Sequence, residues 1–486
     1  MAEATAKLSG LTADGRRDEF FYLCAINRAS LVTNVESGLL TPEQAKKFAP
    51  AIAQVTKKGE EDPAERTDRV IKLEPKLIAI AGPEITELHI GRSSQDMHST
   101  YRVAILRDDI LDVYKALNAL LDEFAAKARE HRAVVVPNYT NGVAAQPNSL
   151  GHYLLGISET LVRERTRLEE LYARADRCSM GGTVLNGTGW PLDRRAMAKR
   201  LGFDGIYENA FDATQGAPVY LPVEFAQIMQ SIALPIAAFI QDVLVQYAQP
   251  RPWIILEEGE GNTYVSSAMP QKRNPGLLNN TRTLASSVAA GAVEMAFLAH
   301  NLVPGMQDPK NVSYRHNIAV KTENLLAMAL RILKALKVNP ARALEELNSD
   351  WTATQEIADE LMKNHGVPFR IGHHVASAMV SYARANGLTP LTFPYEKMKE
   401  VFKDVTAKEW REEELPMSEE EFHKCLDPEG IVQRRKTEGG PQPESMDRLL
   451  EARDDEDAAA RAWVGAREKA VLDALTNLEA EFNRYL

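Results

Sequence analysis

A polar stretch over residues 261–275 carries the residue types best suited to chemistry on an anion. It holds two adjacent serines, Ser266 and Ser267. Lys272 and Asn274 follow, just before a long apolar segment that predicts a helix. Hydroxyl, ammonium and amide groups near a helix N-terminus can bind negative charge, because the helix dipole favours it there. The same residue types also serve as turn and capping residues, so composition alone leaves both interpretations open.

Other chemistries find less support in the sequence. No group of histidine, cysteine and carboxylate residues has the spacing of a metal site, and no glycine-rich phosphate loop appears, so we expect no cofactor and no metal. The cysteines are far apart and odd in number, which is no disulfide framework. We expect three buried thiols in a protein of the reducing cytoplasm. They are Cys24, Cys178 and Cys425.

Length and composition describe an ordinary globular protein. The 486 residues are 44% apolar and 26% charged, with a net charge of −11, which argues against a nucleic-acid partner. No uncharged apolar run reaches the ~18 residues of a membrane span, so we expect no membrane association. The segment Met1–Thr5 lacks a basic stretch leading into an apolar core, and we expect no signal peptide.

The elements that must position the polar stretch have the pattern of long helices. Apolar residues recur at helical spacing over residues 110–128, 150–171, 223–247, 281–298 and 322–336. Several of these segments are apolar on more than one face, and a single chain offers too few partners to bury them. The pattern predicts an all-α protein with a central bundle, and a homo-oligomer whose core is built by several chains.

The regions on either side of the bundle differ from it in composition. Short helical segments alternate with glycine and proline turns before it, and prolines interrupt a more charged region after it. The tail from Pro443 predicts one long amphipathic helix or two, and the best strand signal is residues 132–137. The three predicted regions are residues 1–112, residues 113–366 with the loop 259–275, and residues 367–486.

As a whole, residues 261–275 closely resemble the signature of the aspartase/fumarase superfamily, G-S-S-x-M-P-x-K-x-N-P. Within it, the segment M-P-Q-K-R-N-P is especially similar to the argininosuccinate lyase branch. In that superfamily the first serine is the catalytic base on a mobile loop, and the lysine and asparagine bind the substrate carboxylate. The resemblance implies these roles for Ser266, Lys272 and Asn274, with Ser267 and Met269 beside them in the substrate-binding loop.

The resemblance extends over nearly the whole chain. Residues 88–96 look like the family's L-H-T-G-R-S-R-N-D, residues 138–147 look like G-Y-T-H-L-Q-x-A-Q-P, and residues 366–374 look like G-V-P-F-R-x-A-H-H. The implied fold has three helical domains and a central bundle that forms a twenty-helix core in a homotetramer with shared active sites. This agrees with the oligomer predicted from the helix pattern.

The implied reaction removes a proton from the carbon beside a carboxylate and expels a group from the next carbon. It needs a positioned base and donors for the charge that spreads into the carboxylate. Lys272 and N–H groups at a helix start can favour a serine alkoxide. The other expected substrate-binding residues come from two matched segments: Arg92, Ser93, Ser94, Gln95, Thr140, Asn141 and Gln146.

Departures from the argininosuccinate lyase pattern alter the groups that serve the leaving half of the substrate. Asn141 stands where the family has a histidine, and Asn279 where it has the glutamate that pairs with that histidine. An amide cannot transfer a proton at neutral pH. Residues 94–95 replace an arginine and an asparagine, and Val265 replaces the signature glycine. The family's tyrosine and glutamine have no clear counterpart near residues 305–308.

These changes leave Ser266, Lys272 and Asn274, which are expected to serve the succinyl half of the substrate, in place. They therefore predict a different amine. In this respect the chain resembles ethylenediamine-disuccinate (EDDS) lyase, which splits N-substituted aspartates into fumarate and an amine. A secondary amine can leave without an outside acid, whereas a guanidinium gains more from one. The leading hypothesis is a carbon–nitrogen lyase on a small N-substituted aspartate. The alternatives are an argininosuccinate lyase with an atypical site and a non-catalytic structural protein on the same fold.

Overall fold

The chain is built mainly from helices in the computed structural model, which describes residues 8–486. The all-α prediction is confirmed. The expectation of no signal peptide at Met1–Thr5 lies outside the described residues.

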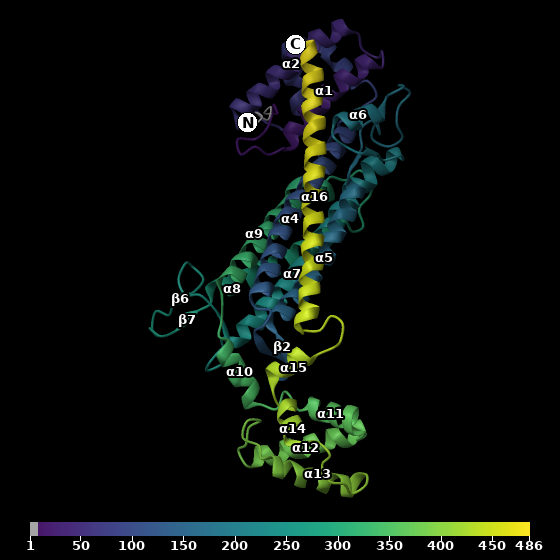
Figure 1. Cartoon of the computed structure of the whole chain (residues 1–486). Helices are drawn as coiled ribbons and strands as arrows, with labels where there is room; N and C mark the ends of the chain where they lie inside the picture. Colours follow the sequence, from purple (N-terminus) through teal and green to yellow (C-terminus); the bar gives the residue numbers. More distant parts are fainter. Residues whose placement is uncertain (1–7) are drawn as a thin grey trace, which may run out of the picture.

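Five long helices run side by side as the central bundle (Figure 1). They pack in a closed ring in the order α4, α5, α7, α8, α9 and back to α4. Helices that follow one another along the chain run in opposite directions, whereas α9 and α4, which close the ring, run in the same direction. Their bounds are α4 Ser94–Glu130, α5 Leu150–Ala175, α7 Ala217–Gln246, α8 Gly276–Ala299 and α9 Val312–Ala335.

All five apolar segments of the sequence lie within or largely within these helices, so this part of the prediction is confirmed. The helix α4 begins well before its apolar pattern does. Ser93 and Asp96 form a capping box that satisfies the first backbone N–H groups, and this fixes the start of the helix. A π-helical turn over Asp212–Gly216 leads directly into α7.

Short strands connect the helices and form four two-stranded pairs. The predicted strand at residues 132–137 overlaps β1, which continues into a hairpin with β2. The strands are β1 Val135–Thr140, β2 Val143–Ser149, β3 Arg177–Cys178, β4 Gly205–Ile206, β5 Ile254–Leu256, β6 Tyr264–Val265, β7 Arg273–Asn274 and β8 Leu336–Val338. The pairs are β1–β2, β3–β4, β5–β8 and β6–β7.

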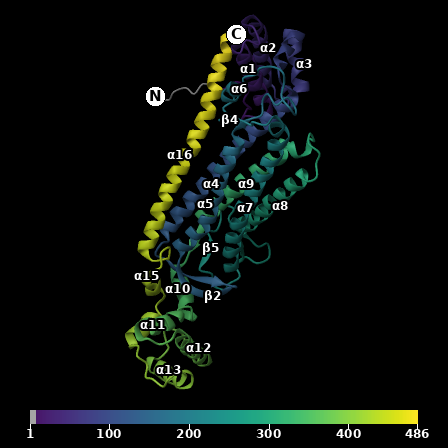
Figure 2. The same ribbon diagram turned by 90° about the vertical axis from the view of Figure 1, so that its right-hand side faces the viewer.

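The remaining helices cap the two ends of the bundle (Figure 1). Those at the upper end are α1 Glu19–Glu36, α2 Pro42–Glu61, α3 Val70–Ala81 and α6 Arg194–Arg200. Those beyond the lower end are α10 Pro340–Ser349, α11 Gln355–His365, α12 Phe369–Ala385, α13 Tyr395–Glu409, α14 Glu419–Cys425 and α15 Pro428–Arg434. The last helix, α16 Pro443–Phe482, runs back along the bundle to α1 and α2 as a single helix (Figure 2).

Two separate hydrophobic cores divide the chain differently from the three predicted regions. One core joins the upper helices, the bundle and α16. The other lies entirely between Trp351 and Leu426, among helices α11 to α14. The predicted region 367–486 therefore differs from the compact lower unit, because α16 buries its apolar face against α1, α4 and α6 instead.

The most apolar helix belongs to the bundle. The segment Asp212–Gln246 is long and apolar enough to cross a membrane by length and composition. However, Phe225, Ile228 and Met229 are fully buried among the other bundle helices. Its outer face keeps exposed apolar side chains, and α8 does the same. These are Tyr220, Leu234 and Val245 on α7, and Val293 and Phe297 on α8.

Candidate active site

The signature loop, residues 259–275, closes a two-stranded ribbon that projects from the side of the bundle (Figure 1). In this ribbon Tyr264 pairs with Asn274 and the next residue pairs with Arg273, so the residues between them form the tip. Arg273 Nε donates to Glu258 Oε2 at 2.7 Å and fastens the base of the ribbon. A short paired ribbon thus holds the serine, lysine and asparagine of the signature on one compact loop.

The Ser266 hydroxyl receives two backbone hydrogen bonds. The N–H groups of Met269 and Ala268 donate to Ser266 Oγ at 3.3 and 3.4 Å. Ser266 N in turn donates to the carbonyl of Lys272 at 3.2 Å, which closes the tip. Backbone donors aimed at Oγ stabilise negative charge there, as a serine base requires. Within residues 8–486 of this one chain, no side chain hydrogen-bonds to that oxygen.

The rest of the loop tip faces outward. Ser267, Met269 and Lys272 are exposed, and the Asn274 amide donates to the carbonyl of Tyr264 at 3.3 Å. The tip also exposes apolar surface, because Tyr264 is 60% exposed and Met269 44% exposed. Charged and apolar side chains that project together from a ribbon favour contact with another molecule.

The β1–β2 hairpin carries Thr140 and Asn141 at its own tip. Thr140 pairs with Val143, which leaves a two-residue turn of Asn141 and Gly142. Their φ values are 52° and 78°, the left-handed conformation that a type I′ hairpin turn requires at both positions. Asparagine tolerates this conformation better than most residues do. The turn therefore gives a structural reason for Asn141, independent of the histidine that the family has there.

Tyr139 fixes the hairpin to the lower end of the bundle. Its hydroxyl donates to a Glu346 carboxylate oxygen and accepts from Trp253 Nε1 at 2.9 Å and Gln246 Nε2 at 3.3 Å. All three partners come from different elements, so one phenol joins the hairpin to α10, the end of α7 and the segment before β5. This places the neighbouring Thr140 on a rigid base.

The start of α4 presents the third group of expected residues. Ser93 caps the helix, Ser94 is exposed, and Gln95 Nε2 is buried without a hydrogen-bond partner in the described part of the chain. Behind them the Asp96 carboxylate accepts from Ser93 N at 2.6 Å and Gly181 N at 3.0 Å. Burial raises the pKa of Asp96 to about 6. The helix start thus offers free polar donors on a braced backbone.

Two of the expected substrate-binding residues make hydrogen bonds within the protein. Arg92 is buried, and its guanidinium donates to Ser30 Oγ at 2.9 Å and Asn27 Oδ1 at 2.8 Å. Gln146 donates to Gln355 Oε1 at 2.7 Å, at the junction with the lower unit. Both contacts arise from elements distant in sequence, which a motif comparison does not reveal. The substrate-binding role that we expected for Arg92 and Gln146 stays a prediction.

A buried cationic pair that the sequence pattern does not reveal lies in the first part of α4 and the segment before α9. Lys310 is 3% exposed, and its ammonium donates to Gln215 Oε1 at 2.9 Å. Burial, with a smaller effect from Arg102, lowers the pKa of Lys310 to about 8. Arg102 donates to Gln307 Oε1 at 2.8 Å but leaves Nε and Nη1 buried without partners in the described residues. Two buried cations with spare donors form a site that suits an anion.

Backbone strain accompanies this cationic pair. Thr183 and Val184 have φ values of 44° and 73°, which is exceptional for β-branched residues. The Val184 carbonyl accepts from Gln215 Nε2 at 3.0 Å and from the Thr214 hydroxyl. The π-helical turn 212–216 carries both donors. Strained backbone and π-turns concentrate at functional sites, and neither was visible in the sequence pattern.

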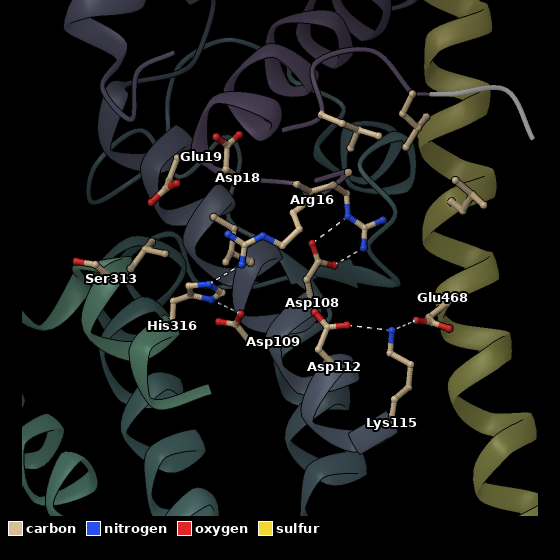
Figure 3. Close-up of a pocket in the computed structure, with 17 residues that line it drawn as sticks. Arg16, Asp18, Glu19, Asp108, Asp109, Asp112, Lys115, Ser313, His316 and Glu468 are labelled. Carbon is tan, nitrogen blue, oxygen red and sulfur yellow. Dashed lines mark hydrogen bonds and ion pairs between the residues drawn. The ribbon is translucent and has the colours of Figure 1, made fainter. Parts of the chain in front are cut away.

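A cavity of about 590 Å³ lies farther along α4, between the N-terminal segment, α9 and α16 (Figure 3). There His316 lies between Asp109 Oδ1 at 2.9 Å and Arg16 Nη1 at 2.8 Å, and the hydrogen bond that the Asp109 carboxylate accepts from His316 Nδ1 raises the pKa of His316. Other ion pairs at the cavity are Arg17–Asp108, Lys115–Asp112 and Lys115–Glu468. The charged lining residues are thus largely engaged with one another.

The three groups of expected residues do not meet within one chain. Ser93–Gln95 lie at the upper end of the bundle, while the β1–β2 hairpin follows the other end of α4. With 37 residues, α4 is about 55 Å long. The signature loop also belongs to the lower half, between the end of α7 and the start of α8 (Figure 1). No substrate of amino-acid size can bridge this distance.

Comparison with known proteins identifies the class that this fold and loop define. The sequence profile described as "Lyase" matches residues 33–290, more than half of the chain, and the profile described as "Argininosuccinate lyase C-terminal" matches residues 350–433. The chain belongs to this lyase family, in the argininosuccinate lyase branch of the aspartase/fumarase superfamily. The predicted family is confirmed.

Individual relatives narrow the activity to a class of reaction. The argininosuccinate lyase of Geobacillus sp. is 28% identical over 424 residues, which cover 85% of this chain and 88% of that protein. The enzyme of the same name from Methanothermobacter thermautotrophicus is 27% identical over 453 residues, covering 91% and 94%. A crystal structure of EDDS lyase in complex with formate superposes with a TM-score of 0.86 at 25% identity, covering 96% and 92%. The chain is a fumarate-releasing carbon–nitrogen lyase, as predicted.

Proposed function

We propose that the protein cleaves an N-substituted L-aspartate into fumarate and an amine, with Ser266 as the base. The observation that carries this proposal is the pair of backbone N–H groups directed at Ser266 Oγ within the signature loop. The alkoxide takes a proton from the carbon beside a carboxylate, and charge spreads into that carboxylate. The bond from the next carbon to nitrogen then breaks, and its electron pair leaves with the amine.

The carboxylate that receives the charge needs donors that strengthen as the charge grows. Lys272 supplies a point charge and Asn274 a neutral donor from the same loop as the base, with Ser267 and Met269 beside them. A loop that carries both the base and the groups that bind the carboxylate keeps their relative positions fixed when the loop moves. These residues therefore serve the succinyl half of the substrate, whichever amine leaves.

Complete sites require several chains. The 55 Å between the α4 start and the hairpin supports an antiparallel arrangement, in which the upper end of one chain meets the lower end of another. The exposed apolar faces of α7 and α8 support burial between chains. We therefore propose a homotetramer in the cytoplasm, with each site built from the signature loop of one chain, Thr140 of a second and the α4 start of a third.

The α4 start binds a second substrate carboxylate in this proposal. Ser93, Ser94 and Gln95 supply hydrogen-bond donors at a helix N-terminus. Arg102, two turns farther along α4, and the buried Lys310 near it supply positive charge from a desolvated position, where charge acts more strongly than in water. In this proposal the region supplies the positive charge that the family supplies with an arginine at the position of Ser94.

Two amines remain as candidates for the leaving group. Absence of the histidine–glutamate pair and superposition with EDDS lyase favour an alkylamine. The named relatives and the matched C-terminal region favour arginine. The structural reason for Asn141 weakens the argument from the missing histidine, and the change at Asn279, exposed in the first turn of α8, has no such explanation. We propose the alkylamine.

Fumarate release distinguishes the two candidates. The purified protein is mixed with ethylenediamine-disuccinate and, separately, with argininosuccinate, and fumarate absorbance is followed, with Ser266→Ala as the background control. We expect kcat/KM to be at least ~100-fold higher for the alkylamine substrate, which corresponds to about 3 kcal/mol of transition-state discrimination. Equal or faster cleavage of argininosuccinate would contradict the proposal and show that the protein is an argininosuccinate lyase. Release from neither substrate would overturn both.

A further inference from the structure

The lower unit carries a cluster of three side chains with the donor atoms of a metal site. Glu360 and His365 lie in the last turns of α11, and Glu421 lies in the first turn of α14. One donor atom from each lies within 4.8 Å of the other two, and all three side chains are half-buried. No local sequence pattern indicates this cluster, because helices α12 and α13 separate its two parts.

Neighbouring groups orient both carboxylates. The backbone N–H and the hydroxyl of Ser418 donate to Glu421 Oε2 at 2.7 and 2.9 Å. This leaves Glu421 Oε1 facing His365 Nε2 at 3.6 Å. The Asn364 side-chain amide donates to Glu360 Oε1, so that Oε2 of this carboxylate is also left over. Hydrogen bonds that hold the second oxygen of each ligand are a usual support for metal coordination.

The cluster is not neutralised by protein cations. Among the described residues, no lysine or arginine forms an ion pair with Glu360 or Glu421, although the adjacent Glu420 pairs with Lys424 at 2.6 Å. His365 Nε2 is buried and has no hydrogen-bond partner in the same part of the chain. Two carboxylates and an imidazole nitrogen without a hydrogen-bond partner therefore converge at the C-terminal end of α11, where the helix dipole favours a cation.

We propose that Glu360, His365 and Glu421 bind a divalent transition-metal ion of the zinc type and so tie α11 to α14. The imidazole nitrogen favours such an ion over Mg²⁺ or Ca²⁺, which prefer oxygen ligands. Tetrahedral zinc sites place neighbouring ligand atoms about 3.3 Å apart, close to the 3.6 Å between Glu421 Oε1 and His365 Nε2. A water molecule completes the coordination. This site is separate from the proposed active site and does not depend on it.

Zinc binding by the intact protein tests the proposal. The full-length chain is stripped with a chelator, dialysed and titrated with ZnCl₂ and, separately, MgCl₂ in a calorimeter, and its melting temperature is measured with and without zinc. The variants are His365→Asn and Glu421→Gln, since glutamine keeps the capping box with Ser418. The matched control is His423→Asn, which removes a neighbouring histidine that is 54% exposed. Circular dichroism establishes that each variant is folded.

We expect one zinc ion per chain, no magnesium binding and a higher melting temperature with zinc. Loss of one protein ligand should weaken zinc binding at least ~100-fold in both variants and leave the control unchanged. Equal zinc affinity in wild type and His365→Asn, or no stoichiometric binding by wild type, would overturn the site. Fumarate release by both variants should match wild type. Failure of fumarate release in every protein would contradict the proposed function and leave the metal site intact.

Discussion

Lys310 offers a prediction whose size follows from the structure. Its pKa falls from 10.5 to about 8 because the ammonium is buried, and Arg102 adds to the effect. Between these two pH values the unfolded chain binds more protons at this residue than the folded chain does, so the free energy of unfolding rises with pH. The full difference corresponds to about 3 kcal/mol. Below pH 8 the folded protein bears this cost, and near pH 10.5 the cost disappears.

Replacing the ammonium with an apolar group of similar length should remove this cost. We expect Lys310→Met to raise the free energy of unfolding at pH 7 by about 2 kcal/mol, because loss of the hydrogen bond to Gln215 offsets about 1 kcal/mol. The measurement is urea unfolding at pH 7, 8, 9 and 10, at one protein concentration. The control is Lys337→Met, whose side chain is 59% exposed. The advantage of Lys310→Met over wild type should shrink as pH rises.

The same lysine should affect anion binding in the opposite direction. The inhibition constant of fumarate for wild type should increase above pH 8, as the ammonium loses its charge, and in Lys310→Met it should be higher and independent of pH in that range. A pH-independent stability difference between the two proteins would refute the argument that Lys310 is a buried cation. A fumarate constant unchanged by the substitution would remove Lys310 from the anion site, whatever its effect on stability.

Three further predictions concern the loop and the hairpin. Ser266→Ala should lower kcat at least ~10³-fold with an unchanged circular dichroism spectrum, and a variant that keeps a tenth of wild-type kcat would exclude this base. Refolding Thr140→Ala together with Ser266→Ala should restore about a quarter of wild-type fumarate release if sites are shared in a random tetramer, whereas each variant refolded alone stays inactive. Tyr139→Phe leaves the buried donors of Trp253 and Gln246 unpaired. It should cost about 1–3 kcal/mol in urea unfolding and raise KM more than it lowers kcat, and an unchanged KM would show that Tyr139 does not position the hairpin.

The bundle was predictable because its helices bury apolar stripes that repeat along the sequence. Local hydrogen bonds set the ends, and these were less visible. The helix α4 starts at Ser94 because Ser93 and Asp96 form a capping box. The division of the C-terminal region was not predictable either. The tail helix looks amphipathic wherever it packs, and only tertiary contacts place it against α1 instead of the lower unit.

The loop of the candidate site was predictable because its signature is compact and specific. The buried cations Arg102 and Lys310 were not predictable. Lys310 follows Asp308-Pro309 in an ordinary turn-like sequence, and only the fold buries it beside Gln215. Arg92 lies in a matched motif that predicts substrate contact, and only the fold shows that Asn27 and Ser30 accept hydrogen bonds from its guanidinium. Burial and partner choice depend on distant segments, which a local pattern does not contain.

The position of α16 has a consequence for how the chain folds during synthesis. Its last turns lie against segments that come much earlier in the chain. Glu479 accepts from Ser9 N at 3.1 Å, and Glu481 accepts from Arg200 Nε, in α6, at 2.8 Å. Helices α1 and α2 therefore cannot complete their core until the 40-residue helix α16, much later in the chain, has left the ribosome. The unit between Trp351 and Leu426 has its own core and can finish earlier. Translation that stops just before Pro443 would release a chain in which α1 and α2 are less completely folded than the unit between Trp351 and Leu426.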